Sequence, residues 1–342
     1  MMVCAPDLRQ ETRLQAFLGR PGRRGLIALA LALALALALP LAHAQAYPNR
    51  PIRVLVGYAA GGGVDAMARM LAQRLPAVLG QQVVVENRAG ASGMIAAEAV
   101  ARSAPDGYTL LMGESGMLIT SHLQPRAGLD PLKAFAPVAG TFIAPLMIVA
   151  NNSIPAEDPK QLIALLKANP GKYSYATSGV GTVHHLGFEM LKAQTGAFIV
   201  HIPYRGAAQI LPDVIGGQVQ IGVVSAAAGL TQARAGKVRP IALMNTGKLA
   251  GAENVAAMAD ALPGFNVAPR LMLLAPAGTP AAVVEKLSDA VRGVLESAEL
   301  AQAAAAQGAI PAYLPPAPLG SALAQESAEW AGLMKTQKIA AQ

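Results

Sequence analysis

Residues 52–69 read IRVLVGYAAGGGVDAMAR, and this stretch decides how the rest of the chain is interpreted. The apolar run at its start has the composition of a buried β-strand. Gly61 and its neighbours form a turn, and apolar residues at helical spacing follow Asp65. A glycine-rich turn between a strand and a helix leaves the first helical N–H groups free to bind an anion. The stretch therefore predicts an α/β protein with an anion-binding loop.

Several kinds of loop fit this pattern. A phosphate-binding P-loop requires Lys and then Ser or Thr after the glycines, and neither follows here. An NAD-dependent enzyme is an alternative, because Gly61-x-Gly63-x-x-Ala66 and Glu86 have the fingerprint spacing. Against it, three residues separate the strand from the glycines, and Asp65 would face a pyrophosphate. A small carboxylate needs only backbone N–H groups, with Asp65 capping the helix or ordering the loop. A plain tight turn with a capping Asp is the simplest alternative.

The segments after this loop continue the α/β pattern. Strand-like runs at 52–59, 83–87 and 108–113 alternate with helical patterns at 65–80 and 91–104, which predicts a parallel sheet covered by helices. A long apolar connection then leads into a second α/β set, and another apolar connection leads back to helices. The connections are residues 132–153 and 266–280, and the helical patterns after them are 281–297 and the tail from 301, broken near 313–318. Two lobes with a hinge are expected, with the C-terminal helices packed on the first lobe.

The first 46 residues predict a cleaved secretory signal peptide. Five arginines precede the apolar run from Leu26 to Leu39, and the segment ends in AHAQA, with cleavage after Ala44 or Ala46. The 14-residue core is shorter than the roughly 20 residues that span a bilayer. The pattern does not decide between general secretion and twin-arginine export.

Composition excludes several function classes. Cleavage after Ala44 would remove five arginines and two acidic residues, lowering the net charge from +7 to +4, and no basic cluster with aromatics points to nucleic acid. The only cysteine, Cys4, would be removed too, so no disulfide or thiol chemistry is expected. The adjacent His184 and His185 point in different directions on a helix, so no metal site is predicted. No G-x-S-x-G elbow is present, and no enzyme is expected.

Several motifs in a fixed order resemble one family. They are VENRAGASG at 85–93, PDGYTLL at 105–111, YATSGVGTVHHLGFEML at 175–191, VHIPYRG at 200–206 and LLAPAGTP at 273–280. With the opening stretch, they are similar to the Bug family, the periplasmic solute receptors of tripartite tricarboxylate transporters. The resemblance covers essentially the whole chain from Tyr47.

The resemblance implies a two-lobed periplasmic binding protein of type II, a Venus flytrap. Each lobe would be a mixed sheet flanked by helices, joined by two hinge connections. The first lobe would comprise residues 47–144 and 268–342, and the second residues 145–267. Family membership implies a monomer without cofactor that captures a small organic carboxylate between the lobes and delivers it to a membrane permease. The same fold serving as a ligand sensor for a signalling partner is an alternative.

The resemblance also implies which residues contact the ligand. In the first lobe they are Tyr58, Ala59, Gly61, Gly62 and Asp65, with Ser115 as a weaker candidate. In the second lobe they are Ser178, Gly179, Gly181, Thr182, His185 and Tyr204. Each has a structural alternative, since Ser178 and Thr182 could merely cap a helix, and Tyr204 could be a rim aromatic.

The chain departs from the family pattern at two places. Where the family often has an aspartate after the strand, this chain has Val224 and then Ser225, so a less acidic cleft is expected there. Where the family often has S-W-F-G, this chain has Pro269, Arg270, Leu271 and Met272. We therefore expect Arg270 either to pair with a second anionic group of the ligand or to be a solvated rim residue.

Overall fold

The computed structural model describes residues 47–125, 129–204, 206–246 and 249–339. The predicted signal peptide, residues 1–46, lies outside the described residues. All elements below belong to one compact unit that begins at Arg50. Within the described ranges, no helix has the length and apolar character needed to cross a membrane.

The first lobe is built on a mixed sheet of six strands. Its spatial order is β11-β4-β10-β3-β1-β2. The strands are β1 (Ile52–Val56), β2 (Val83–Asn87), β3 (Thr109–Glu114), β4 (Phe135–Ile143), β10 (Arg270–Pro276) and β11 (Ile310–Leu314). β1 pairs in parallel with β2 and β3, as predicted, whereas β10 runs antiparallel to both β3 and β4. β11 also runs antiparallel to β4, so β10 and β11 make the sheet mixed.

Helices from both ends of the described chain cover this sheet. They are α2 (Gly63–Leu79), α3 (Met94–Ala101), α4 (Gly116–Leu123), α5 (Pro131–Ala134), α10 (Ala281–Leu295), α11 (Ala298–Ala306) and α12 (Pro316–Thr336), and a 3₁₀ turn (Ala91–Gly93) precedes α3. α2 buries an apolar face that includes Met67 and Leu71, and it ends at Gly80 in the left-handed conformation. The helix therefore begins directly after the glycine turn, as the sequence predicted.

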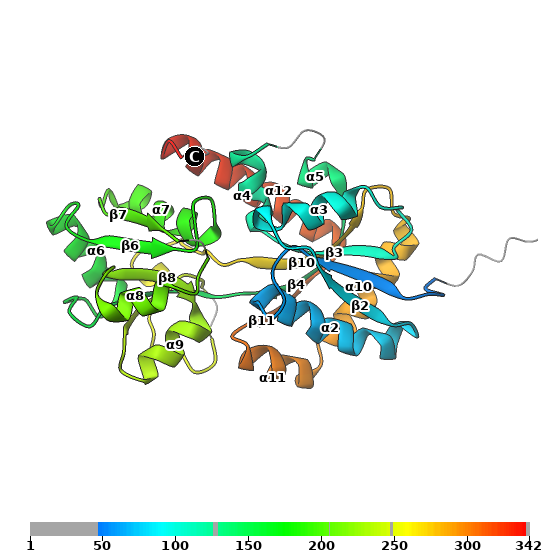
Figure 1. Cartoon of the computed structure of the whole chain (residues 1–342), viewed down its shortest axis with the longest axis horizontal. Coiled ribbons are helices and arrows are strands. Elements are labelled where there is room, and N and C mark those ends of the chain that lie inside the picture. The colour runs from blue at the N-terminus through cyan, green and yellow to red at the C-terminus, as the bar shows by residue number, and fades with distance from the viewer. Residues whose placement is uncertain (1–46, 126–128, 205, 247–248, 340–342) are drawn as a thin grey trace, which may run out of the picture. The chain divides into compact units, whose positions relative to one another are not determined.

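The second lobe is built on a sheet of five strands in the order β7-β6-β8-β5-β9. The strands are β5 (Leu146–Ala150), β6 (Ser174–Thr177), β7 (Val200–Pro203), β8 (Ile221–Ser225) and β9 (Arg239–Leu243), and the helices are α6 (Pro159–Ala168), α7 (Val183–Thr195), α8 (Ile210–Gly216), α9 (Ala226–Arg234) and the 3₁₀ turn η2 (Met258–Asp260). These elements are contiguous in sequence and are drawn mostly in green in Figure 1, whereas the first lobe takes its elements from both ends.

Two crossings connect the sheets. Only Ala144 and Pro145 separate β4 from β5, and the return runs from β9 to β10. The sequence pattern reads 132–153 as a connection, but most of it forms β4 and β5. Every residue of β5 is buried, so the run has no alternation to mark it as a strand. The residues nearest the crossings are therefore held in sheets on both sides.

The C-terminal helix α12 packs in two places. Leu319 and Leu323 join the core of the first lobe. Trp330 and Met334 instead join a cluster with Leu186 of the second lobe. Only the first part of α12 thus follows the expectation that the C-terminal helices pack on the first lobe. The large apolar side chains near its end bury area against α7, a long-range contact that no local pattern encodes.

Candidate functional site

A cavity of about 440 Å³ is lined by residues of both lobes. This volume lies within the range of small-molecule sites, roughly 300–1,000 Å³. The first lobe contributes Tyr58, Gly63, Val64, Met67, Ser92, Glu114, Gly116, Ala144, Pro269, Leu271 and residues 307–309. The second lobe contributes Pro145, Leu146, Ser178, Gly181, Thr182, Val183, His184, Ala207 and Ser225. We call this cavity the cleft.

Four helices begin at the cleft. α2 and α4 come from the first lobe, and α7 and α9 from the second. The cleft is lined by the first residues of α2, α4 and α7 and by Ser225, the residue that precedes α9. Helix starts carry N–H groups without intrahelical partners and the positive end of the helix dipole. Their convergence places the partial positive charges of four helix starts at the cleft.

Asp65 holds the first loop in shape from behind. Its buried carboxylate accepts hydrogen bonds from Gly61 N at 2.8 Å, Asn87 Nδ2 at 2.8 Å and Arg69 Nε at 3.0 Å. Burial opposes ionisation, but the hydrogen bonds from Arg69, Gly61 and Asn87 hold the pKa of this carboxyl below its usual range. Asn87 also donates to Tyr58 O at 3.1 Å. Asp65 therefore orders the loop but does not line the cleft.

Tyr58 and Glu114 form a hydrogen-bonded pair in the cleft wall. The Tyr58 hydroxyl donates to Glu114 Oε2 at 2.7 Å, and Gly116 N donates to Glu114 Oε1 at 3.0 Å. Burial raises the pKa of the Glu114 carboxyl, although both donors act in the opposite direction. Burial and the nearby Glu114 carboxylate raise the pKa of Tyr58 as well, so its hydroxyl keeps its proton. The pair places an acidic group in a site otherwise suited to anions.

The second loop brings His184 into the cleft and keeps it neutral. Its Nδ1 lies 2.5 Å from Ser178 Oγ. Burial lowers the pKa of His184 to about 4. When Ser178 donates to Nδ1, the other ring nitrogen carries the proton and can donate to a ligand. Thr182 caps α7 by accepting from His185 N at 3.3 Å and donates to Gly179 O at 2.8 Å.

His185 points into the core of the second lobe. It is buried, and its ring stacks on His201 with centroids 4.1 Å apart. Its Nδ1 accepts from Gly181 N at 3.2 Å, so it supports the loop from the inside. The sequence-based prediction favoured His185, whereas the structure places His184 at the cleft and His185 behind it. Adjacent helical residues point about 100° apart, so one of the pair must face away.

The buried His185 and the partly buried His201 predict acid sensitivity of the fold. Burial lowers the pKa of His185 to about 4 and that of His201 to about 3, against an ordinary value of 6.5. Protons bind more tightly to these histidines in the unfolded chain than in the folded one. Their contribution to the free energy of unfolding is therefore fully present above pH 6.5, and it is lost as the pH falls towards 4. The loss approaches about 1.4 kcal/mol per pH unit for each histidine.

The measurement is the free energy of unfolding in urea at pH 7, 6, 5 and 4. Compared with the native chain, His201→Gln is expected to flatten the dependence between pH 6.5 and 4. Equal slopes for the two proteins would contradict the contribution of His201 to the acid sensitivity.

Most of the other predicted residues lie beside the cleft without lining it. Ser115 is buried, and its hydroxyl accepts from Arg270 N at 3.2 Å. The hydroxyl of Tyr204 is hydrogen-bonded to Asp213 of α8. Gly179 accepts the hydrogen bond from Thr182. Ala59, Gly61 and Gly62 shape the turn before α2, in which Gly62 N donates to Ala59 O at 3.2 Å. Of the predicted residues, Tyr58, Ser178, Gly181, Thr182 and Ser225 line the cleft.

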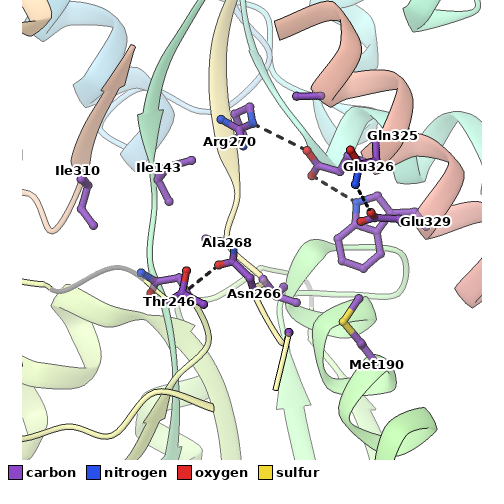
Figure 2. Close-up of a pocket in the computed structure, with 15 residues that line it drawn as sticks. Ile143, Met190, Thr246, Asn266, Ala268, Arg270, Ile310, Gln325, Glu326 and Glu329 are labelled. Carbon is purple, nitrogen blue, oxygen red and sulfur yellow. Dashed lines mark hydrogen bonds and ion pairs between the residues drawn. The ribbon is translucent and has the colours of Figure 1, made fainter. Parts of the chain in front are cut away.

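Arg270 lines a different cavity, of about 580 Å³. Figure 2 shows it directed towards Glu326 of α12, whose carboxylate lies 4.0 Å from Arg270 Nε. Glu326 also accepts from Trp330 Nε1 at 3.3 Å. The Arg270 Nε atom is buried and has no hydrogen-bond partner among the described residues. This cavity takes its helical residues from the interiors of α7 and α12, so it lacks the helix starts that characterise the cleft.

Sequence reasoning missed several residues of the cleft. Glu114 ends β3 and follows a strand pattern that gives no hint of its direction. Gln307, Gly308 and Ala309 come from the C-terminal part of the chain, between α11 and β11. His184 had a local signal, because it follows Thr182 and opens the helix. The other residues had none, since their place depends on how distant segments meet.

The structure also bears on two other kinds of site, a dinucleotide site and a metal site. Glu86, the acid of the dinucleotide fingerprint, accepts two hydrogen bonds from Arg53 on the neighbouring strand, at 2.6 and 2.7 Å. Among the residues described, no group of three or more His, Cys, Asp or Glu is arranged to hold a metal ion.

Comparison with known proteins gives consistent matches. The family model described as "Tripartite tricarboxylate transporter family receptor" matches residues 67–338. The protein BugT of Bordetella pertussis is 36% identical over 295 residues, which cover 85% of this chain and 90% of BugT.

Two solved structures from R. palustris are similar over most of the chain. Rpa4515, solved with adipate, is 32% identical with a TM-score of 0.76, covering 86% of this chain and 100% of that protein. MatC (Rpa3494), solved with bound malate, is 28% identical with a TM-score of 0.70, covering 84% of this chain and 99% of that protein.

Proposed function

We infer that this chain, which belongs to the tripartite tricarboxylate transporter receptor family, captures a small organic carboxylate in the cleft between its two lobes. The observation that carries the proposal is the convergence of four helix starts, two from each lobe, on one cavity. The relatives solved with adipate and malate support a carboxylate as the kind of ligand. Family membership makes the protein a periplasmic solute-binding receptor and not an enzyme.

Helix starts suit a carboxylate because they need no basic side chain. Each favours a nearby negative charge by about 0.3–1 kcal/mol, and by up to about 2 kcal/mol where the site is partly buried. The free N–H groups at the starts of α2 and α7 supply hydrogen bonds to the oxygens. In our proposal Tyr58, Ser178, Thr182, His184 and Ser225 surround the ligand, and Asp65 and His185 hold the loops from behind.

Closure of the lobes would complete the site. Each lobe supplies two of the helix starts, so a ligand contacts starts from both lobes only when the lobes meet, and its differential affinity favours that state. The bodies that move would be residues 47–144 with 268–342 against residues 145–267, turning about the two crossings. We propose that the closed, monomeric receptor, exported with a cleaved signal peptide, delivers the ligand to a membrane permease. In the alternative role, the closed form would instead signal to a sensor partner.

The test is thermal unfolding of residues 45–342 against mono-, di- and tricarboxylates, amino acids and NAD. A ligand at 100 times its Kd stabilises the folded state by about 2.7 kcal/mol. We expect a rise in melting temperature with one class of carboxylates. His184→Ala should reduce that rise, whereas the remote His122→Ala should leave it unchanged. A rise with NAD alone would overturn the proposal.

A further inference from the structure

We propose that the ligand of the cleft is a monocarboxylate with an apolar aliphatic or aromatic body, and not a hydroxylated or doubly charged acid. This inference rests on the proposed function and narrows its ligand class. It follows from the apolar residues that line the cleft beside the helix starts.

The first lobe presents an apolar strip to the cleft. Val64 and Met67 lie three residues apart on α2, so they share one face of the helix. Both line the cleft. Val64 is half-buried, and Met67 is 3% exposed. The helix that offers its N-terminus to the carboxylate therefore offers an apolar surface directly beside it.

The two crossings between the lobes extend this surface. Ala144, Pro145 and Leu146 line the cleft from the first crossing, and Pro269 and Leu271 line it from the second. Leu146 and Leu271 are 2% and 1% exposed. Val183 adds a side chain from the second lobe. A ligand body between the lobes would thus lie against apolar atoms from the crossings and from α2.

Three hydroxyl groups of the cleft wall are engaged within the protein. Tyr58 donates to Glu114, the Ser178 hydroxyl is hydrogen-bonded to His184, and Thr182 donates to Gly179. A hydroxyl or second carboxylate that lies against the apolar surface would lose its hydration there, because that surface offers no donor to replace the water. Beside Glu114, a second carboxylate would also meet another acidic group, which accepts hydrogen bonds and offers none when ionised. An apolar body has no hydrogen bonds to water to lose there, and burying its apolar surface favours binding.

Hexanoate and adipate make a matched pair of probes, because both have six carbons and differ by one carboxylate. Malate adds a short, hydroxylated diacid. Titration calorimetry of residues 45–342 at pH 7.5 is expected to give hexanoate a Kd at least tenfold lower than adipate or malate. Its binding should also show a negative heat-capacity change, the mark of apolar burial. Tighter binding of adipate or malate would overturn this inference while leaving the proposed function intact. Binding of no carboxylate would overturn both.

A variant tests whether the apolar strip faces the ligand. Val64→Lys adds a cation to the strip and should shift the ratio of hexanoate to adipate affinity at least tenfold towards adipate. Val78→Lys adds the same charge near the other end of α2, where the side chain is 57% exposed, and should leave the ratio unchanged. Circular dichroism melting would establish that both variants fold. An unchanged ratio in a folded Val64→Lys protein would overturn the placement.

Discussion

Replacing Gly308 by alanine is expected to weaken carboxylate binding at least tenfold. Gly308 lines the cleft from the first lobe, and an added Cβ would lie 2.3 Å from the Cβ of Ala227 in α9 of the second lobe. Real Cβ atoms do not approach so closely, so the lobes would have to separate. The clash exists only where the lobes meet, and its cost therefore falls on the ligand-binding state and lowers the affinity.

The control isolates this clash from backbone strain. Gly308 has φ +68°, and Gly236 has φ +67° with nothing within 4 Å of an added Cβ. Both alanine variants should lose stability by about 1–2 kcal/mol, because both force a left-handed alanine. Only Gly308→Ala should lose affinity, and Ala227→Gly added to it should restore part of the loss. Calorimetry gives the Kd of the tightest-binding carboxylate for the native chain, the two single variants and the double variant. Equal affinities for the two single variants would show that the lobes bind ligand without this contact.

The second large effect is expected for Asp65→Ala. The substitution leaves the donors of Gly61 and Asn87 without their buried acceptor. Losing hydrogen bonds to a charged group costs about 1.5–3 kcal/mol each, so with two donors a loss of about 3–6 kcal/mol in unfolding free energy is expected. The glycine loop before α2 would then lose its fixed shape. We expect ligand affinity to fall at least tenfold, because the helix start no longer sits in its binding geometry.

Asp158→Ala provides the matched comparison. Asp158 caps α6 of the second lobe by accepting from Gln161 N at 2.8 Å, and its side chain does not line the cleft. Its removal should cost about 1 kcal/mol of stability, the usual value for a cap. Affinity should stay the same. Urea unfolding and calorimetry of both variants separate the two effects. A destabilised Asp65→Ala protein that retains full affinity would contradict a role for this residue in shaping the site.

Local sequence patterns were enough to predict a large part of the first lobe. The sequence predicted β1, the glycine turn, α2 and the parallel pairing of β1 with β2 and β3. It did so because strand and helix periodicities and glycine turns are properties of neighbouring residues. The family resemblance supplied the two-lobed class. Helix starts also follow from local sequence, so Thr182 could be placed at the start of α7.

Only the tertiary structure decided which side chains meet. Arg270 follows the second crossing, yet it turns to Glu326 of α12 and away from the cleft. His184 and His185 are neighbours in sequence, and packing of His185 on His201 leaves His184 to face the cleft. Gly308 reaches the cleft from a segment more than 200 residues after the first loop. Backbone periodicity is fixed by short-range sterics, whereas side-chain direction and the meeting of distant segments depend on how the whole core buries its apolar area.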